Sequence, residues 1–176
     1  MGGLRPGSVG PPEHLSDAHH LDGFDSGVRD LDTWLLRRAR PNEVSGASRT
    51  YVACADGPAG SRVVGYYALA TGAVAQAMAT GRVRRSMPEP IPVMVLARLA
   101  VDRGHQGQGL GSALLRDALL RTLAAASIAG IRAVLLHTIS DDDRRFYEHE
   151  GFASSPIDAM TMMVTLADLR RALDGG

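Results

Sequence analysis

Residues 92–115 read PVMVLARLAVDRGHQGQGLGSALL, and this stretch decides the fold expected for the chain. Its first half, Val93 to Val101, is apolar except at Arg98 and is too short to span a bilayer, so it suits a strand covered on both faces. After a turn comes Gln106 to Gly111, the glycine loop, in which every second residue lacks a side chain. A ligand can therefore approach several peptide N–H groups there.

A helix is predicted to follow directly, over residues 110–128. The first turn of a helix has unpaired N–H groups and a partial positive charge, so a phosphate or pyrophosphate is its natural ligand. The alternation of Gly107, Gly109 and Gly111 does not fit the Rossmann fingerprint G-x-G-x-x-G. A Walker loop is excluded as well, because it needs a lysine and the sequence has none.

A second motif, RFYEHEGF at residues 145–152, follows another predicted strand, IRAVLLH at residues 131–137. The two strands and the helix between them form a strand–helix–strand unit, which we expect to be parallel and right-handed. Three aspartates then open a short helix over residues 144–150, and Gly151 ends it. Tyr147 is thus placed on a short helix just beyond the second parallel strand.

Both motifs are found together in one known family. Gln106, Gly109 and Gly111 match the pattern Gln/Arg-x-x-Gly-x-Gly/Ala, which resembles the pyrophosphate loop of the GNAT acetyltransferases. FYEHEGF is similar to the closing signature of the same family. The resemblance implies an α/β (α+β) fold: a mixed central sheet of about six to seven strands, flanking helices and a splayed central strand pair that holds acetyl-CoA.

The resemblance also implies which residues contact acetyl-CoA and which residue acts as acid. The cofactor contacts are Leu99, Ala100, Val101, Gln106, Gly107, Gln108, Gly109, Leu110, Gly111, Ser112 and Ser140. Many members have asparagine where this chain has Ser140. Tyr147 is the candidate general acid, because a phenol with a pKa of about 10 can protonate a leaving thiolate whose thiol has a pKa of about 8.5.

Further segments resemble the toxin branch of this family, from about Leu15 to Leu166. They are GFDSG, LDTWL and SRVVGYYAL, together with the two motifs above. Members of that branch accompany ribbon-helix-helix antitoxins and block translation by acetylating the α-amino group of aminoacyl-tRNA. The resemblance thus implies a homodimer and a basic tRNA surface. A cytoplasmic location is the default, because nothing in the sequence points to membrane or export. The candidate tRNA contacts are Arg37, Arg38, Arg82, Arg84 and Arg85.

Composition sets limits on these expectations. The 176 residues are 45% hydrophobic, enough for one domain over residues 14–176, while the glycine- and proline-rich residues 1–13 are expected to be a flexible lead-in. Net charge is zero, so nucleic acid must be bound through a local patch; between Asp56 and Glu89 no residue is acidic. With Cys54 as the only cysteine, no internal disulfide forms, and no metal site is predicted. No apolar run or leader indicates a membrane.

The N-terminal half supplies the remaining elements. Residues 49–55 and 62–69 predict an antiparallel hairpin, and residues 72–79 a weaker third strand. Before the hairpin, the spacing of Leu31, Trp34 and Leu35 predicts a helix that ends at Pro41. Residues 160–166 predict a last strand.

Several alternatives remain open from the sequence. The acceptor could instead be a small amine or a protein N-terminus, and a cofactor-binding module without turnover is a third reading, against which Tyr147 argues. The amine of an aminoacyl ester is weakly basic and needs little help from a general base. His137 and Glu148 could serve as one, although a strand-end histidine and an exposed helix glutamate are ordinary structural residues. Arg98 could face the cofactor or pair with an acid.

Overall fold

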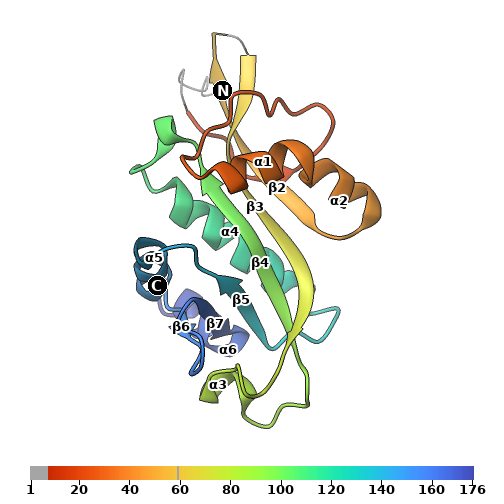
Figure 1. The fold of residues 1–176 in the computed structure, drawn as a ribbon, viewed down its shortest axis with the longest axis vertical. Coiled ribbons are helices and arrows are strands. Elements are labelled where there is room, and N and C mark those ends of the chain that lie inside the picture. The colour runs from red at the N-terminus through yellow and green to blue at the C-terminus, as the bar shows by residue number, and fades with distance from the viewer. Residues whose placement is uncertain (1–7, 59) are drawn as a thin grey trace. The chain divides into compact units, whose positions relative to one another are not determined.

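The computed structural model describes residues 8–58 and 60–176, and Figure 1 labels most of its elements. In chain order they are β1 (Glu13–His14), α1 (Arg29–Arg37), α2 (Ala39–Ser45), β2 (Arg49–Gly57), β3 (Gly60–Val74), α3 (Gly81–Arg84), β4 (Ile91–Val101), the 3-10 turn η1 (Arg103–His105), α4 (Leu110–Ala125), β5 (Ala133–His137), α5 (Asp141–His149), β6 (Ala153–Ser154), β7 (Thr161–Thr165) and α6 (Leu166–Asp174). The strands form a seven-stranded mixed sheet in the order β1-β2-β3-β4-β5-β7-β6. The expected α/β fold with six to seven strands is therefore confirmed.

The central strands β4 and β5 are parallel and connected through α4, as the strand–helix–strand pattern predicts. Their ladder joins only Val93, Met94 and Val95 to residues 133–135. Beyond the ladder that is described here, β4 continues to Val101 and β5 to His137, and the splay of these strands stays a prediction. On its other side β5 pairs with β7 in antiparallel fashion along its whole length, from Ala133 to His137.

The chain divides into two compact units. The first contains the described residues up to Leu69 together with Arg98–Ala118, and the second contains Ala70–Ala97 with Leu119–Gly176. Because β3, β4 and α4 have residues in both units, the chain passes through each unit more than once. A single domain over residues 14–176 stays a prediction.

Each unit has its own buried apolar cluster. In the first unit the cluster consists of Leu15, Leu21, Phe24, Leu35, Ala39, Val52, Val63, Tyr66 and Ala100. In the second it consists of Val74, Ala79, Val83, Ile91, Val93, Ala133, Leu135 and Met163. Aromatic packing strengthens the first cluster, since Trp34 stacks on Tyr66 and Phe24 meets the same ring edge-on.

Two local expectations need correction. Pro41 does not end the first helix, because α1 stops at Arg37 and Pro41 lies in the first turn of α2. Backbone N–H groups in the first turn have no acceptor within the helix, so a proline, which lacks this N–H, is tolerated there. The weak third strand is instead the continuation of β3 to Val74. Gly72 permits this continuation, because a Cβ on it would lie 2.8 Å from Cγ2 of Val95.

The expected flexible lead-in, residues 1–13, includes residues 1–7, which lie outside the described part of the chain. Within the remainder, Val9 forms a bridge with Ala55, and Gly10 N–H donates to the carbonyl of Cys54 at 2.9 Å. These residues therefore lie along β2. Among the described residues, no helix is both long enough and apolar enough to cross a membrane.

Candidate active site

The glycine loop lies between η1 and α4 and exposes its backbone. Gly107 and Gly109 have φ values of +73° and +83°, a conformation that other residues rarely adopt, and a Cβ on either would meet nothing within 4 Å. From Gly107 to Gly111, no backbone N–H donates to any described residue. Together with the N-terminus of α4, these free N–H groups have the geometry that suits an anion, and the binding of a pyrophosphate here stays a prediction.

Gln106 fixes the base of this loop. Its Nε2 donates to the carbonyls of Ser26 and Val101, both at 2.9 Å. The side chain therefore connects the end of β4 to the segment before α1. Gln106 was predicted to contact the cofactor, and the structure gives its amide nitrogen a positioning role in the loop. Within the first unit, the predicted contacts Leu99 to Val101 and the glycine loop are thus held together.

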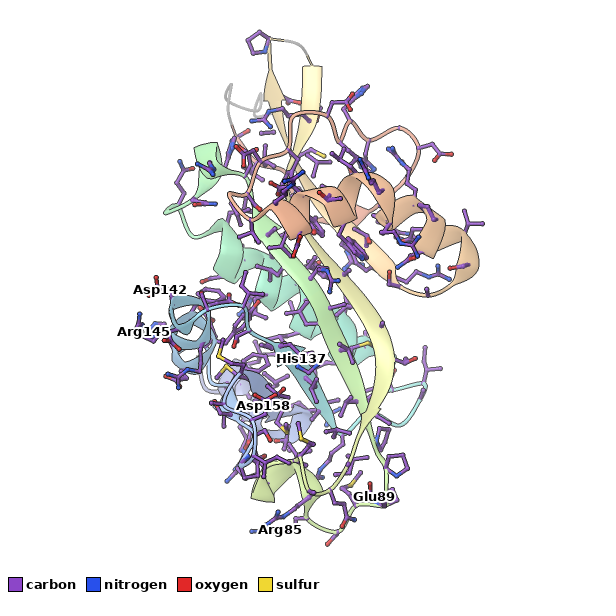
Figure 2. All side chains as sticks on the ribbon, viewed as in Figure 1. Arg85, Glu89, His137, Asp142, Arg145 and Asp158 are labelled. Atoms are coloured by element: carbon purple, nitrogen blue, oxygen red, sulfur yellow. The ribbon has the colours of Figure 1, made fainter. Side chains whose placement is uncertain are left out.

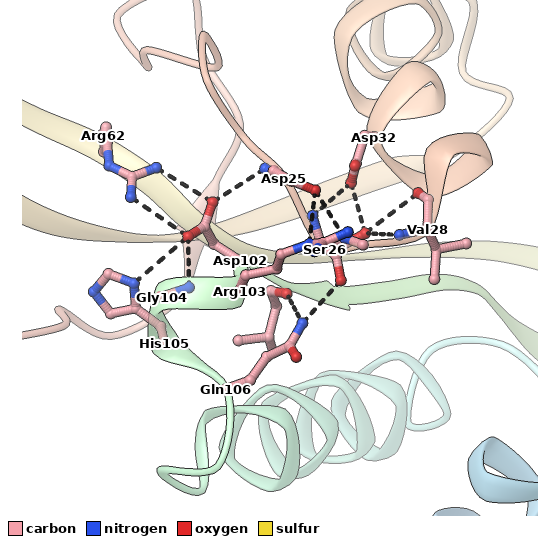
Figure 3. A network of polar contacts seen from close by, with 12 residues as sticks. Asp25, Ser26, Val28, Asp32, Arg62, Asp102, Arg103, Gly104, His105 and Gln106 are labelled. Atoms are coloured by element: carbon pink, nitrogen blue, oxygen red, sulfur yellow. Dashed lines mark hydrogen bonds and ion pairs between the residues drawn. The ribbon is translucent and has the colours of Figure 1, made fainter.

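A buried carboxylate, Asp102, organises the same region (Figure 3). It accepts hydrogen bonds from Arg62 at 3.4 Å and from the backbone N–H groups of Asp25 and Gly104, both at 3.1 Å. Burial by itself would raise the pKa of Asp102, but these donors outweigh it and hold the pKa below its usual range. Sequence reasoning missed this network because its members come from three separate segments; the only signal was an acid directly after an apolar strand.

Tyr147 lies on α5 in the second unit and is 5% exposed. Its ring meets Phe146 and Phe152 edge-on, at centroid distances of 4.9 and 5.6 Å. Burial, with a smaller contribution from Asp143, raises the pKa of Tyr147 well above its ordinary value. Within its own unit the hydroxyl has no hydrogen bond to a described residue. The phenol is therefore protonated and free to donate.

Ser140 caps the helix that carries Tyr147. Its Oγ accepts from the N–H of Asp143 at 3.1 Å, while the carboxylate of Asp143 accepts from the N–H of Ile139 at 3.0 Å. This is a variant of the capping box, in which two orphan N–H groups at a helix start are satisfied. The serine that replaces the family's asparagine thus fixes the start of α5, and its contact with the cofactor stays a prediction.

The candidate tRNA contacts fall on both units. Arg37 and Arg38 are exposed at the end of α1. Arg84 and Arg85 are exposed at the end of α3, and neither side chain has an ion pair with a described residue. Arg82 differs, because it binds Asp168 through two hydrogen bonds of 2.6 and 2.8 Å. Four of the five arginines are thus available to phosphate, and Arg82 is engaged in the fold.

Replacing Arg82 with glutamine is expected to lower Tm at neutral pH. Hydrogen bonds from Arg82 hold the pKa of Asp168 at about 2, below its ordinary value of 3.8. A depressed carboxyl pKa stabilises the fold above the ordinary value, and the contribution is lost as pH falls toward the folded value. The Tm difference between wild type and Arg82→Gln should therefore shrink as the pH is lowered from about 5 to about 3. Thermal unfolding followed by circular dichroism measures it, and a difference independent of pH would contradict the assignment.

One group of potential metal ligands occurs among the described residues: atoms of Glu13, His19 and Cys54 lie within 4.8 Å of one another. His19 Nδ1 accepts from the N–H of Ser16 at 2.9 Å, so its Nε2 carries the proton and donates to Glu13 at 2.7 Å. The ring has no lone pair left for a metal, and the group is a hydrogen-bonded pair beside a thiol. His14 is paired in a similar way, because its Nε2 lies 2.8 Å from a carboxylate oxygen of Glu43.

A comparison of sequences points to the same family as the glycine loop and the α5 motif do. Residues 46–154 match the model of the acetyltransferase (GNAT) domain. The chain belongs to the GNAT acetyltransferase family. It is an enzyme of the acyltransferase class, and both of the motifs considered above lie within the matched residues.

Individual GNAT relatives are similar over most of the chain. The "tRNA-acetylating toxin" of Mycobacterium tuberculosis (strain ATCC 25618 / H37Rv) is 52% identical over 159 residues, which cover 90% of this chain and 93% of the relative. The "Probable toxin TacT" of Sinorhizobium fredii (strain NBRC 101917 / NGR234) is 27% identical and covers 86% and 88%. A close sequence relative therefore exists with a known kind of substrate.

Solved GNAT structures share the fold. The structure described as "AtaT complexed with acetyl-methionyl-tRNAfMet" has a TM-score of 0.84 and 24% identity, and covers 94% of this chain and 99% of that one. At this identity the likeness concerns the fold alone. The overall fold of this chain is thus shared with that solved structure.

Proposed function

We propose that this protein is an acetyl-CoA-dependent N-acetyltransferase toxin that acetylates the α-amino group of aminoacyl-tRNA and so blocks translation. The observation that carries the proposal is the 52% identity, over 90% of the chain, to a relative named a tRNA-acetylating toxin. Such identity makes a shared substrate class the simplest expectation. The structure of AtaT, which has a similar fold and is described in complex with acetyl-methionyl-tRNAfMet, is consistent with the proposal.

The residues of the glycine loop fit acetyl-CoA. The free N–H groups from Gly107 to Gly111 would hold the pyrophosphate, since they are unpaired and stand at the positive end of α4. The end of β4, Leu99 to Val101, would hold the pantetheine arm through peptide groups beyond the β5 ladder. Bound acetyl-CoA supplies the activated acetyl group. A related AtaT structure is described as bound to acetyl-CoA.

Tyr147 would complete the transfer. When the amine displaces CoA, the sulfur leaves with a negative charge, and a nearby phenol can protonate it. The raised pKa of Tyr147 keeps the proton on the oxygen until that moment. Tyr147 therefore enters the reaction as the neutral, protonated phenol at neutral pH.

The acceptor stem of tRNA would lie on the exposed arginines. The double variant Arg84→Gln/Arg85→Gln is expected to weaken tRNA acetylation and to reduce the slope of log affinity against log salt by about 2, because each lost phosphate contact removes roughly one released counterion. Acetyl-CoA affinity should stay unchanged. Arg170→Gln, an exposed arginine on α6, is the matched control. An equal loss in the control would show a general charge effect and reject specific contacts.

Transfer of radiolabelled acetyl from acetyl-CoA tests the proposed function directly. The acceptors are charged tRNA, uncharged tRNA and a panel of small amines. Label on charged tRNA alone would establish the proposal and identify the preferred aminoacyl group. Label on a small amine or a protein N-terminus alone would reject it, while the fold and family stand.

The partners follow from the same proposal. Structures of AtaT are described with the C-terminus of its antitoxin AtaR. A toxin of this kind needs such an inhibitor in the cell that makes it, and we propose a ribbon-helix-helix antitoxin for this chain. We further propose that the enzyme is a homodimer and acts in the cytoplasm, where aminoacyl-tRNA is found.

A further inference from the structure

His137 lies at the last position of β5 and is directly opposite Thr161 of β7. Its Nδ1 is 2.9 Å from the hydroxyl oxygen of Thr161. The same hydroxyl donates to the carboxylate of Asp158 at 2.7 Å. A continuous chain of hydrogen bonds therefore joins His137 to Asp158 through one buried threonine, and Figure 2 labels both ends.

This chain fixes the tautomer of His137. A hydroxyl has one proton, and the Thr161 proton is given to Asp158, whose carboxylate can only accept. Thr161 must then accept from Nδ1, so Nδ1 carries the ring proton. The neutral imidazole is left with its lone pair on Nε2, the nitrogen that makes no hydrogen bond to a described residue of this unit.

Asp158 is held in the ionised state that this assignment requires. Hydrogen bonds from the Thr161 hydroxyl and the Met160 N–H, with attraction to His137, keep the pKa of Asp158 below its usual range. The elements around His137 carry few other titratable groups. Within this unit, β7 and the β4 residues Ile91–Ala97 have none. The acids at the start of α5 include Asp143, which is bonded to Ile139 N–H.

The location suits contact with a substrate. His137 is exposed at the carboxyl end of a parallel strand, beyond the point at which the β4–β5 ladder stops at Val95 and Leu135. Ligands of open α/β sheets bind at the carboxyl ends of such strands. The connection from β5 to the Tyr147 helix is also fixed, since Thr138 N–H donates to the carbonyl of Met160 at 2.7 Å.

We propose that His137 is the general base of the reaction, with Nε2 accepting the proton of the attacking α-amine and with Thr161 and Asp158 orienting the ring. The assignment rests on the proposed function and adds a catalytic residue to it. The histidine that the sequence leaves as an ordinary strand-end residue thereby acquires a specific role.

The proton balance of the step is complete. The amine nitrogen forms a bond to the acetyl carbon, and one of its protons passes to Nε2 of His137. The carbon–sulfur bond then breaks, and Tyr147 gives its proton to the leaving sulfur. The imidazolium releases a proton to solvent and the phenolate regains one, so that an amide and a free thiol are the only products.

The pH dependence of kcat/KM for charged tRNA tests the proposal in three variants. His137→Gln should lower kcat by about 10²-fold, the usual contribution of a general base. Asp158→Asn keeps an acceptor for Thr161 but removes the charge that stabilises the imidazolium. It should therefore move the acidic limb of the profile to lower pH. The matched control is His149→Gln, which changes an exposed histidine of α5 whose side chain has no hydrogen bond, ion pair or ring contact with a described residue. It should match wild type.

Acetyl-CoA affinity and Tm are measured alongside and should stay close to wild type. If kcat/KM of His137→Gln fell by the same factor at every pH, and the acidic limb did not shift in Asp158→Asn, His137 would have a structural role. The proposal would then be overturned. Wild type that acetylates only a small amine would reject the proposed function instead. The pH profiles of the same variants, measured with that amine as the acceptor, would then decide the role of His137. A failure of the general-base proposal is therefore distinguishable from a failure of the proposed function.

Discussion

Replacing Tyr147 with phenylalanine is expected to lower kcat by about 10²- to 10⁴-fold, the range over which a positioned acid accelerates proton transfer. The substitution removes one oxygen from a ring packed between Phe146 and Phe152, so the fold should be unaffected. Acetyl-CoA should bind as before, because the pyrophosphate site is the glycine loop. Single-turnover acetyl transfer and CoA titration measure the two quantities separately.

A matched variant, Tyr51→Phe, removes the hydroxyl of a half-buried tyrosine on β2. It should retain wild-type kcat. If Tyr147→Phe also retained it, Tyr147 would be a core aromatic, and the leaving sulfur would have to be protonated by solvent or by another group.

The second large effect is expected at Gly109. The variants Gly109→Asp and Gly109→Asn have side chains of nearly the same shape, and both residue types tolerate the positive φ of this position better than others. They differ in charge. A carboxylate about 4 Å from a pyrophosphate oxygen costs roughly 4 kcal/mol at an effective dielectric constant of 20. Acetyl-CoA affinity should therefore fall on the order of 100-fold or more in Gly109→Asp.

Calorimetric titration with CoA compares the two variants. Gly109→Asn should lose only a few-fold, about 1 kcal/mol, through the strain of the backbone. Equal losses in the two variants would mean that shape rather than charge limits the site, and the anion would then lie elsewhere. Thermal unfolding of each variant excludes a general loss of structure.

The elements that carry the chemistry could be predicted from the sequence because their signals are local. The glycine loop, the strand before it and the helix after it are contiguous, and the capping residues of α5 lie next to Tyr147. Pro41 shows how a local signal can mislead, since proline either ends a helix or sits in its first turn. The spacing of apolar residues alone does not separate these cases.

The supporting contacts could not be predicted, because they depend on register and on segments far apart in the sequence. Thr161 meets His137 only through the pairing of β5 with β7, and a shift of one residue would turn its side chain to the other face. Arg82 was assigned to a basic patch, but its partner Asp168 lies on the last helix. A window without acidic residues says nothing about acids from other segments.

Asp102 has a consequence for the energetics of ligand binding. One carboxylate joins the segment before α1, the β3 strand and the turn that leads into the glycine loop. A movement of the glycine loop that displaced Asp102 would break its hydrogen bond with the segment that leads into α1. A ligand that binds better when Asp102 holds the loop in place would also favour this attachment, and the coupling is reciprocal. Asp102 and Gln106 thus couple the glycine loop to the segment that leads into the first helix.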